Sequence, residues 1–301
     1  MSFQYSMYKL TASLGGIKKQ MHGSAEKLTA LSLQRQKEYR FVCPADDFRH
    51  HYVNHVLEDR NCIHISARGK TNDRALLYLY GGHMLMPPED SDLQAAREIA
   101  DLTDREVWFF HYPLCGDCSM EDAVHLTHLL YGKMLDFYKP ENIAVYGAAS
   151  GAFLALAAML YNNTLRNRLP SCSKMILISP SSCWSSEEEK AAMLAMKDRD
   201  IMNDPASLEV IREILDHGKK IPEYMLSGSG GDYRGLPETW MFYGSEECFS
   251  AKAGFFEKAY AAGKSRCHVR VRQDMCSCYC TAVKFPEAQE DYDTVINILK
   301  Q

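Results

Sequence analysis

The sequence predicts an α/β fold in which a mostly parallel central sheet is covered by helices on both faces. The first observation is that apolar, strand-like runs alternate with helical patterns from residue 74 to the C-terminal region. The second is that these runs are almost continuously apolar, which is typical of parallel strands buried on both sides. The third is a helical stretch at about 181–236 that interrupts the alternation and predicts a cap, or lid, over the sheet.

Each element is expected from its own local pattern. Two β-rich runs, 51–57 and 62–67, are separated by Glu58-Asp-Arg-Asn61 and predict a hairpin. The expected remaining strands are 74–80, 106–111, 142–146, 174–179, 239–243 and 268–273. The expected helices are 25–39, 91–102, 120–138, 151–165, 250–262 and 286–299, on apolar spacings near 3.6 residues.

The chain is expected to divide into an N-terminal helical segment and one large domain. Residues 1–50 form the helical segment, which could belong to the cap, and 51–301 form the sheet domain with the insertion at 181–236. Within that insertion Asp204-Pro205 predicts a helix start, and Leu208 and Ile211 share one apolar face of the helix that follows. A purely decorative insertion is the alternative to a lid.

Composition limits the class of protein. A chain of 301 residues with 46% hydrophobic content can bury a large core, and its net charge of −5 with interspersed signs argues against a nucleic-acid partner. Residues 1–20 have no signal-peptide pattern, and no apolar run reaches the roughly 20 residues needed for a membrane span. Eleven cysteines without a secretory signal are typical of reduced thiols, so we expect a cytoplasmic protein.

The stretch around Gly147-Ala148-Ala149-Ser150-Gly151 has the layout of a nucleophile elbow. A buried strand precedes it and an apolar helix follows, as in the Gly-x-Ser-x-Gly turn that exposes a catalytic serine. Counted from the two glycines, the nucleophile position is Ala149, and the serine of the turn, Ser150, lies one place later. The turn therefore predicts acyl-transfer architecture without the nucleophilic oxygen.

Four further segments, in the same order along the chain, resemble those of α/β-hydrolases of the hormone-sensitive-lipase and acetyl-esterase type. Tyr78-Leu-Tyr80-Gly81-Gly82-His83-Met84 resembles the His-Gly-Gly-Gly-Phe oxyanion loop, and the run from His111-Tyr-Pro-Leu114 through Ala123 resembles the Asp-Tyr-Arg-Leu-Ala-Pro-Glu segment. The stretch 224–247, which includes Gly235-Leu-Pro-Glu-Thr239 and Tyr243-Gly-Ser-Glu-Glu247, resembles the segment that leads into the catalytic acid. Gln273-Asp-Met-Cys-Ser277, followed by Phe285-Pro-Glu-Ala, resembles the segment of the catalytic histidine.

The resemblance implies a hydrolase fold, hydrolysis of short or medium carboxylic esters, and no metal or organic cofactor. It assigns oxyanion N–H groups to Gly81, Gly82 and the amide of Ser150, and the catalytic acid to Glu247. The histidine position is Ser277 and the nucleophile position is Ala149. Both groups that transfer the acyl chain and the proton are thus replaced.

Substitutes for these groups are expected to fail. Ser150 as nucleophile would require the elbow to shift by one residue and rotate the apolar helix after it. His83 is expected at the rim of the pocket, which Met84 and Trp184 would also line. The cysteines Cys115, Cys118, Cys276, Cys278 and Cys280 could in principle form a zinc site, although their spacing is not that of standard zinc ligands.

Two explanations of the missing groups remain open from the sequence. One is an esterase in a disabled form, since Ser-to-Ala is the smallest change that removes the nucleophilic oxygen. The other is a natural pseudo-enzyme that binds a small ligand or a partner. In either case a small-molecule ester or an apolar compound is the expected ligand, and the oligomeric state is left open.

Overall fold

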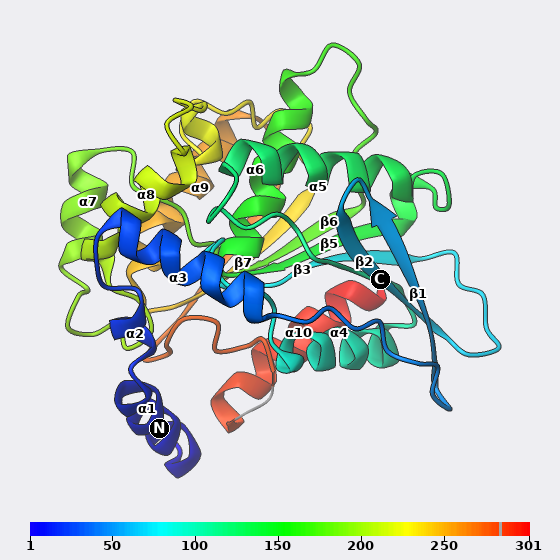
Figure 1. The fold of residues 1–301 in the computed structure, drawn as a ribbon, viewed down its shortest axis with the longest axis horizontal. Helices are drawn as coiled ribbons and strands as arrows, with labels where there is room; N and C mark the ends of the chain where they lie inside the picture. The colour runs from blue at the N-terminus through cyan, green and yellow to red at the C-terminus, as the bar shows by residue number, and fades with distance from the viewer. Residues whose placement is uncertain (283–284) are drawn as a thin grey trace.

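The structure is a three-layer α/β sandwich with additional helices over one edge of the sheet (Figure 1). It is a computed structural model and describes residues 1–282 and 285–301. Helices α4 (Asp90–Thr103) and α10 (Pro286–Lys300) cover one face of the sheet, and α5 (Met120–Met134) and α6 (Ser150–Thr164) cover the other (Figure 1). The predicted fold class is confirmed.

The sheet has the strand order β1-β2-β4-β3-β5-β6-β7-β8. Neighbouring pairs from β4 to β8 are parallel, whereas β2 is antiparallel to both β1 and β4, so the N-terminal hairpin extends a parallel sheet. The strands are β1 His50–Leu57, β2 Arg60–Ala67, β3 Ala75–Leu79, β4 Glu106–Phe110, β5 Ile143–Ala148, β6 Lys174–Ile178, β7 Glu238–Gly244 and β8 Cys267–Arg272.

The central strands are buried along their whole length, as their continuous apolar runs predicted. The strand and helix positions agree with those expected from the sequence to within a few residues. Two helices are shorter than expected: α5 ends at Met134, and the stretch expected at 250–262 is divided into a 3₁₀ turn, η4 (Cys248–Lys252), and α9 (Ala253–Ala262). Residues 135–138 instead form turns with backbone bonds to residues 131–134.

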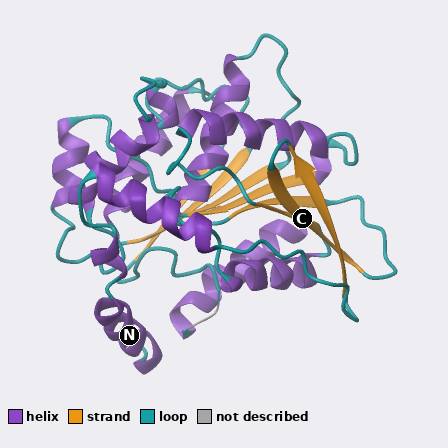
Figure 2. Cartoon of the chain, viewed as in Figure 1, coloured by secondary structure: helices purple, strands orange, loops and turns teal. Residues whose placement is uncertain are grey.

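The N-terminal segment and the insertion before β7 supply the helices above the carboxyl edge of the sheet (Figure 2). The N-terminal helices are α1 Phe3–Gly15, α2 Ile17–Gln20 and α3 Ala25–Glu38. The insertion carries α7 Glu187–Leu194 and α8 Leu208–Asp216, with 3₁₀ turns η2 Pro205–Ser207 and η3 Glu223–Met225. A further 3₁₀ turn, η1 (Pro140–Asn142), precedes β5.

Helix α3, the last helix of the N-terminal segment, contacts both the insertion and the sheet domain. It packs against α8 of the insertion, and the buried Ser32 hydroxyl donates to the carbonyl oxygen of Leu85 at 2.6 Å. Lys18, between α1 and α3, donates to backbone oxygens of the insertion at residues 197 and 200. Among the described residues, no helix has the length and apolarity that crossing a membrane requires.

Candidate functional site

The turn between β5 and α6 has the strained backbone of a nucleophile elbow, and Ala149 is the strained residue. Its φ is 49° and its ψ −119°, a conformation that costs a non-glycine residue of the order of 1–3 kcal/mol. The Ala149 carbonyl accepts from the amides of Ala152 and Ser181, which fixes the turn to the helix and to the strand end beyond it. Its methyl group is half-buried, at the position that the sequence analysis expects for the nucleophile.

The two flanking glycines are required by close backbone approach. A Cβ atom on Gly151 would lie 2.1 Å from the carbonyl oxygen of Tyr80, and one on Gly147 would lie 2.5 Å from Cα of Ala152. The start of α6 is therefore pressed against the ends of β3 and β5. Packing of backbone on backbone holds the elbow, and no serine hydroxyl is needed to form it.

The side chain of Ser150, the serine of the turn, forms a hydrogen bond with the segment after β3. It is 4% exposed, begins α6, and its Oγ accepts a hydrogen bond from the Met84 amide at 3.1 Å. This bond directs the hydroxyl toward the segment after β3. Ser150 therefore links the segment after β3 to the first turn of α6.

The segment expected to form the oxyanion loop follows β3 as a tight turn. Gly82, His83 and Met84 have φ values of 117°, 57° and 63°, and the Gly82 carbonyl accepts from the amides of Leu85 and Met86. A Cβ atom on Gly82 would lie 2.9 Å from the Met86 carbonyl oxygen. Gly81 lies close to the elbow: a Cβ atom on Gly81 would be 3.2 Å from the Cβ atom of Ala149.

Glu247 follows β7 and is completely buried. Its Oε1 accepts from the Gly244 amide at 2.8 Å and from Ser179 Oγ at 2.9 Å, whereas its Oε2 has no well-formed hydrogen bond among the described residues. Burial raises the pKa of Glu247 to about 8, against smaller lowering effects from the neighbouring Ser277 and Gly244. The acid is therefore mostly protonated at neutral pH.

Ser277 lies beside this acid, in the position expected for the histidine. It is 5% exposed, and its hydroxyl approaches the Cys278 sulfur at 3.9 Å. The two loops touch because Gly244 has no side chain: a Cβ atom there would lie 2.1 Å from the Met275 carbonyl oxygen. Among the described residues, neither carboxyl oxygen of Glu247 forms a hydrogen bond to a histidine.

Ser179, which the sequence analysis did not single out, connects the two loops. It follows β6 with φ 48°, donates to Glu247, and accepts from the amide of Cys278 at 2.9 Å. The signal available in the sequence was its position, a polar residue directly after a buried parallel strand. Carboxyl ends of such strands are where α/β sheets bind ligands.

The cavity next to the elbow is small. It lies between His83, Met84 and Ser150 on one side and Leu208, Ile211 and Leu215 of α8 on the other, and its volume is about 20 Å³. That is room for about one water molecule. Burial lowers the pKa of His83. Trp184 is not among the lining residues; Lys190 lies over its ring, 5.3 Å from the centroid.

The cysteines do not assemble a metal site in the described part of the chain, which contains no group of three or more potential ligands. Cys115 and Cys118 are close to each other, but the pKa of Cys115 is raised by its neighbour Cys118 and by burial. Burial also raises the pKa of Cys278, to about 12. Cys115 and Cys278 are therefore thiols at neutral pH.

Residues 76–281 match the family of proteins with an alpha/beta hydrolase fold, so the chain belongs to that family. The match covers the strained elbow, the loop after β3, Glu247 and Ser277. It confirms the resemblance drawn from the sequence motifs.

Individual relatives are esterases and lipases. The chain is 28% identical over 192 residues to an acetyl-hydrolase of Streptomyces hygroscopicus, and the match covers 63% of this chain and 62% of that protein. An esterase/lipase from an uncultured bacterium has the same fold, with a TM-score of 0.79, 17% identity, and coverage of 100% of this chain and 98% of that one. A hormone-sensitive lipase from a metagenome library is similar, with a TM-score of 0.76, 18% identity, and coverage of 98% and 97%.

Proposed function

We propose that this esterase/lipase-like α/β hydrolase does not hydrolyse carboxylic esters by the Ser-His-acid mechanism in this form. The observation that carries the proposal is Ala149 at the strained position of the elbow. A methyl group cannot attack a carbonyl carbon. Ser277 beside the acid supports the same conclusion, because a serine hydroxyl cannot accept and return the proton as an imidazole does.

The protonation of Glu247 gives independent support. In a working triad the carboxylate orients the histidine and stabilises its positive form. With a pKa near 8 and no imidazole beside it, the Glu247 carboxyl is instead a neutral, buried hydrogen-bonding group. Ser150 does not replace Ala149 in this proposal, because its hydroxyl is directed at the Met84 amide.

Ester turnover tests this proposal. The purified chain should show neither a burst nor steady turnover with p-nitrophenyl acetate or p-nitrophenyl butyrate above the rate of buffer. Ser150→Ala is the informative variant: hydrolysis by the parent that this change abolishes would mean that the nucleophile has moved by one residue. Such a result would overturn the proposal.

A second candidate function is the binding of a small apolar ligand or an intact ester beneath the cap. The observation that favours it is the lining of the 20 Å³ cavity, in which Leu208, Ile211 and Leu215 of α8 face Met84 and Phe153. A ligand larger than one water molecule would have to displace α8. We further propose that 1–50 and 181–236 together form the cap, because α3 packs against α8.

Titration with ethyl butyrate, followed by calorimetry, tests this second function. Ile211→Trp should abolish binding by filling the cavity, whereas Glu209→Trp, on the exposed face of the same helix, should leave it unchanged. Equal affinities of the two variants, or an absence of saturable binding to the parent, would contradict it.

A further inference from the structure

Helix α1 exposes a stripe of large apolar side chains. Phe3, Met7 and Leu10 are 78%, 43% and 52% exposed, and their spacing of four and three residues places them on one face of the helix. Every other helix has at most one exposed large apolar side chain, among the residues whose exposure the structure describes. Single apolar side chains are normal at a protein surface, whereas a contiguous group of them indicates an interaction site.

The opposite face of α1 is used for packing against the rest of the protein. Tyr5 is completely buried, and the centroids of the Tyr5 and Tyr8 rings lie 4.6 and 5.5 Å from that of Phe285, the residue before α10. Lys9 forms an ion pair with Glu246 in the loop after β7. These contacts fix α1 at one corner of the molecule (Figure 1). The folded chain therefore holds the helix in place and leaves its apolar stripe uncovered.

The exposed face of α1 carries no charge. Its exposed polar residues are all neutral: Gln4, Ser6, Thr11 and Ser13. The one charged side chain of the helix is Lys9, which pairs with Glu246. Of the two lysines in α2, Lys18 donates to backbone oxygens of the insertion, and Lys19 is exposed. Strong attraction to an anionic membrane takes a cluster of basic residues, so this face suits a neutral surface better.

The stripe is small for a protein–protein interface. Even a whole aromatic side chain buries only about 150–250 Å², and the three side chains of the stripe are already partly covered. Each partner in a stable dimer typically buries about 800 Å². A lipid layer needs no matching groove, because a helix with one apolar face can insert its side chains between the headgroups.

We propose that α1 docks this protein on an electrically neutral lipid surface, with the helix in the plane of the interface and Phe3, Met7 and Leu10 inserted among the acyl chains. Binding then follows the buried apolar area and the packing of the lipids rather than their charge. Because Lys9 pairs with Glu246, the docked helix holds the loop after β7 near the lipid. The proposal does not depend on whether the chain hydrolyses esters.

Flotation of the full chain with phosphatidylcholine vesicles tests the docking. The chain should float with small vesicles more than with large ones, because binding of such helices is sensitive to curvature. Adding phosphatidylserine to the vesicles, or raising the salt concentration, should change the bound fraction little. An absence of binding to phosphatidylcholine vesicles would overturn the proposal. Binding that requires phosphatidylserine and is lost at high salt would overturn it as well.

Two matched variants test the role of the stripe, each replacing two exposed apolar residues by glutamine, which is a good helix former. Phe3→Gln together with Leu10→Gln should lower the vesicle partition coefficient at least about tenfold. Val42→Gln together with Phe48→Gln, two exposed residues outside α1, should leave it unchanged. Melting temperatures show whether both variants are folded. Equal partition coefficients of the two variants would contradict the assignment to α1.

A second copy of the chain is the alternative occupant of the stripe, and analytical ultracentrifugation distinguishes it from lipid. The parent and the variant with Phe3→Gln and Leu10→Gln should sediment alike at every protein concentration. A concentration-dependent dimer that this variant abolishes would assign the stripe to a protein interface and overturn the proposal.

Discussion

The turn at Ala149 and the loop that carries Glu247 differ in what determines their structure. At the elbow, Ala149 still has the strained backbone of a nucleophile, and Gly147 and Gly151 still allow the close packing around it. At the acid loop, Glu247 and Ser277 are brought together by Gly244, but the carboxyl is protonated at neutral pH. Close backbone contacts therefore set the geometry of the first region, and the burial of an ionisable group sets the state of the second.

The difference has a physical origin. Backbone contacts set the elbow, and these do not depend on whether residue 149 carries a hydroxyl group. The charge of Glu247 depends on a partner, because a buried carboxylate without a cation is unfavourable. The predictions below test each half of this comparison.

The largest effect is expected from restoring both missing groups. Ala149→Ser together with Ser277→His should raise kcat/KM for p-nitrophenyl acetate by at least about 10³-fold over the parent, because removal of a triad serine or histidine costs up to about 10⁶-fold. Each single change should give little, since the two groups act as a unit. Stopped-flow detection of a p-nitrophenol burst is the measurement.

Failure of the double variant would have a specific meaning. If it folds, as judged by its melting temperature, and still shows no burst, the elbow or the oxyanion loop lacks the required geometry. The comparison drawn above would then be wrong for the elbow.

The second effect concerns the packing that holds the elbow. Gly151→Ala should lower the free energy of unfolding by about 3 kcal/mol, because the new Cβ would meet the Tyr80 carbonyl oxygen at 2.1 Å. Gly254→Ala is the matched control: it lies in α9 with nothing within 4 Å of the new Cβ, and should raise stability by up to about 1 kcal/mol. Urea unfolding measures both, and equal effects would contradict the packing argument.

The third effect tests the protonation of Glu247. The folded chain keeps this proton up to about pH 8, whereas the unfolded chain loses it near its usual pKa of 4.5. Folding therefore takes up a proton between these values, and the free energy of unfolding falls as pH rises through this window, by at most about 1.4 kcal/mol per pH unit. Glu247→Gln should remove this dependence, so the parent-minus-variant difference should decline from pH 5 to pH 8. A flat difference would show that the acid is ionised.

Much of the scaffold was predictable from local patterns. Continuous apolar runs identified the strands, because strands buried on both faces need apolar side chains. The small residues at 147–151 identified the turn, because backbone segments in close contact leave no room for larger side chains. The residue with the strained backbone, Ala149, could be located by counting from Gly147 and Gly151 for the same reason.

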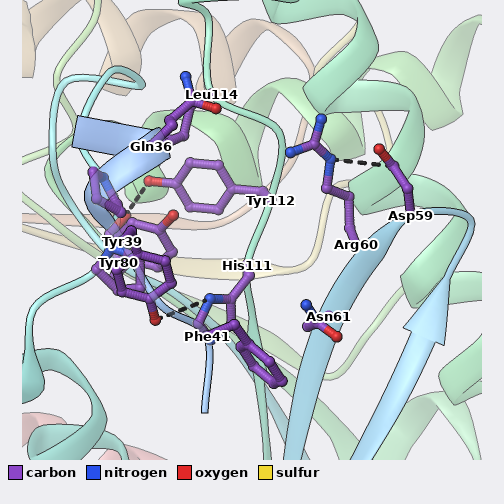
Figure 3. Close-up of a pocket in the computed structure, with 12 residues that line it drawn as sticks. Gln36, Tyr39, Phe41, Asp59, Arg60, Asn61, Tyr80, His111, Tyr112 and Leu114 are labelled. Atoms are coloured by element: carbon purple, nitrogen blue, oxygen red, sulfur yellow. Dashed lines mark hydrogen bonds and ion pairs between the residues drawn. The ribbon is translucent and has the colours of Figure 1, made fainter. Parts of the chain in front are cut away.

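The rest depends on contacts between distant segments. Ser179 could not be linked to Glu247 and Cys278 from sequence, since the three residues come from three different loops. The pKa of Glu247 follows from burial that only the assembled fold creates. Trp184 was expected in the pocket from its position in the insertion, whereas its neighbour Cys183 lines the cavity instead. The pocket drawn in Figure 3 gave no sequence signal, because the residues that line it, such as Phe41, Asn61 and His111, come from separate segments of the chain.

The smallest effect concerns the strain at residue 149 itself. Ala149→Gly should raise the free energy of unfolding by about 1 kcal/mol, because glycine adopts φ 49° without a Cβ clash and this gain exceeds its extra entropy in the unfolded chain. Ala148→Gly, one residue earlier in the regular strand β5, should have the opposite sign and destabilise by a similar amount. Thermal and urea unfolding of the two variants would decide the point. Opposite signs at adjacent alanines would locate the strain at the nucleophile position. Destabilisation by both changes would mean that the backbone at residue 149 is unstrained in solution.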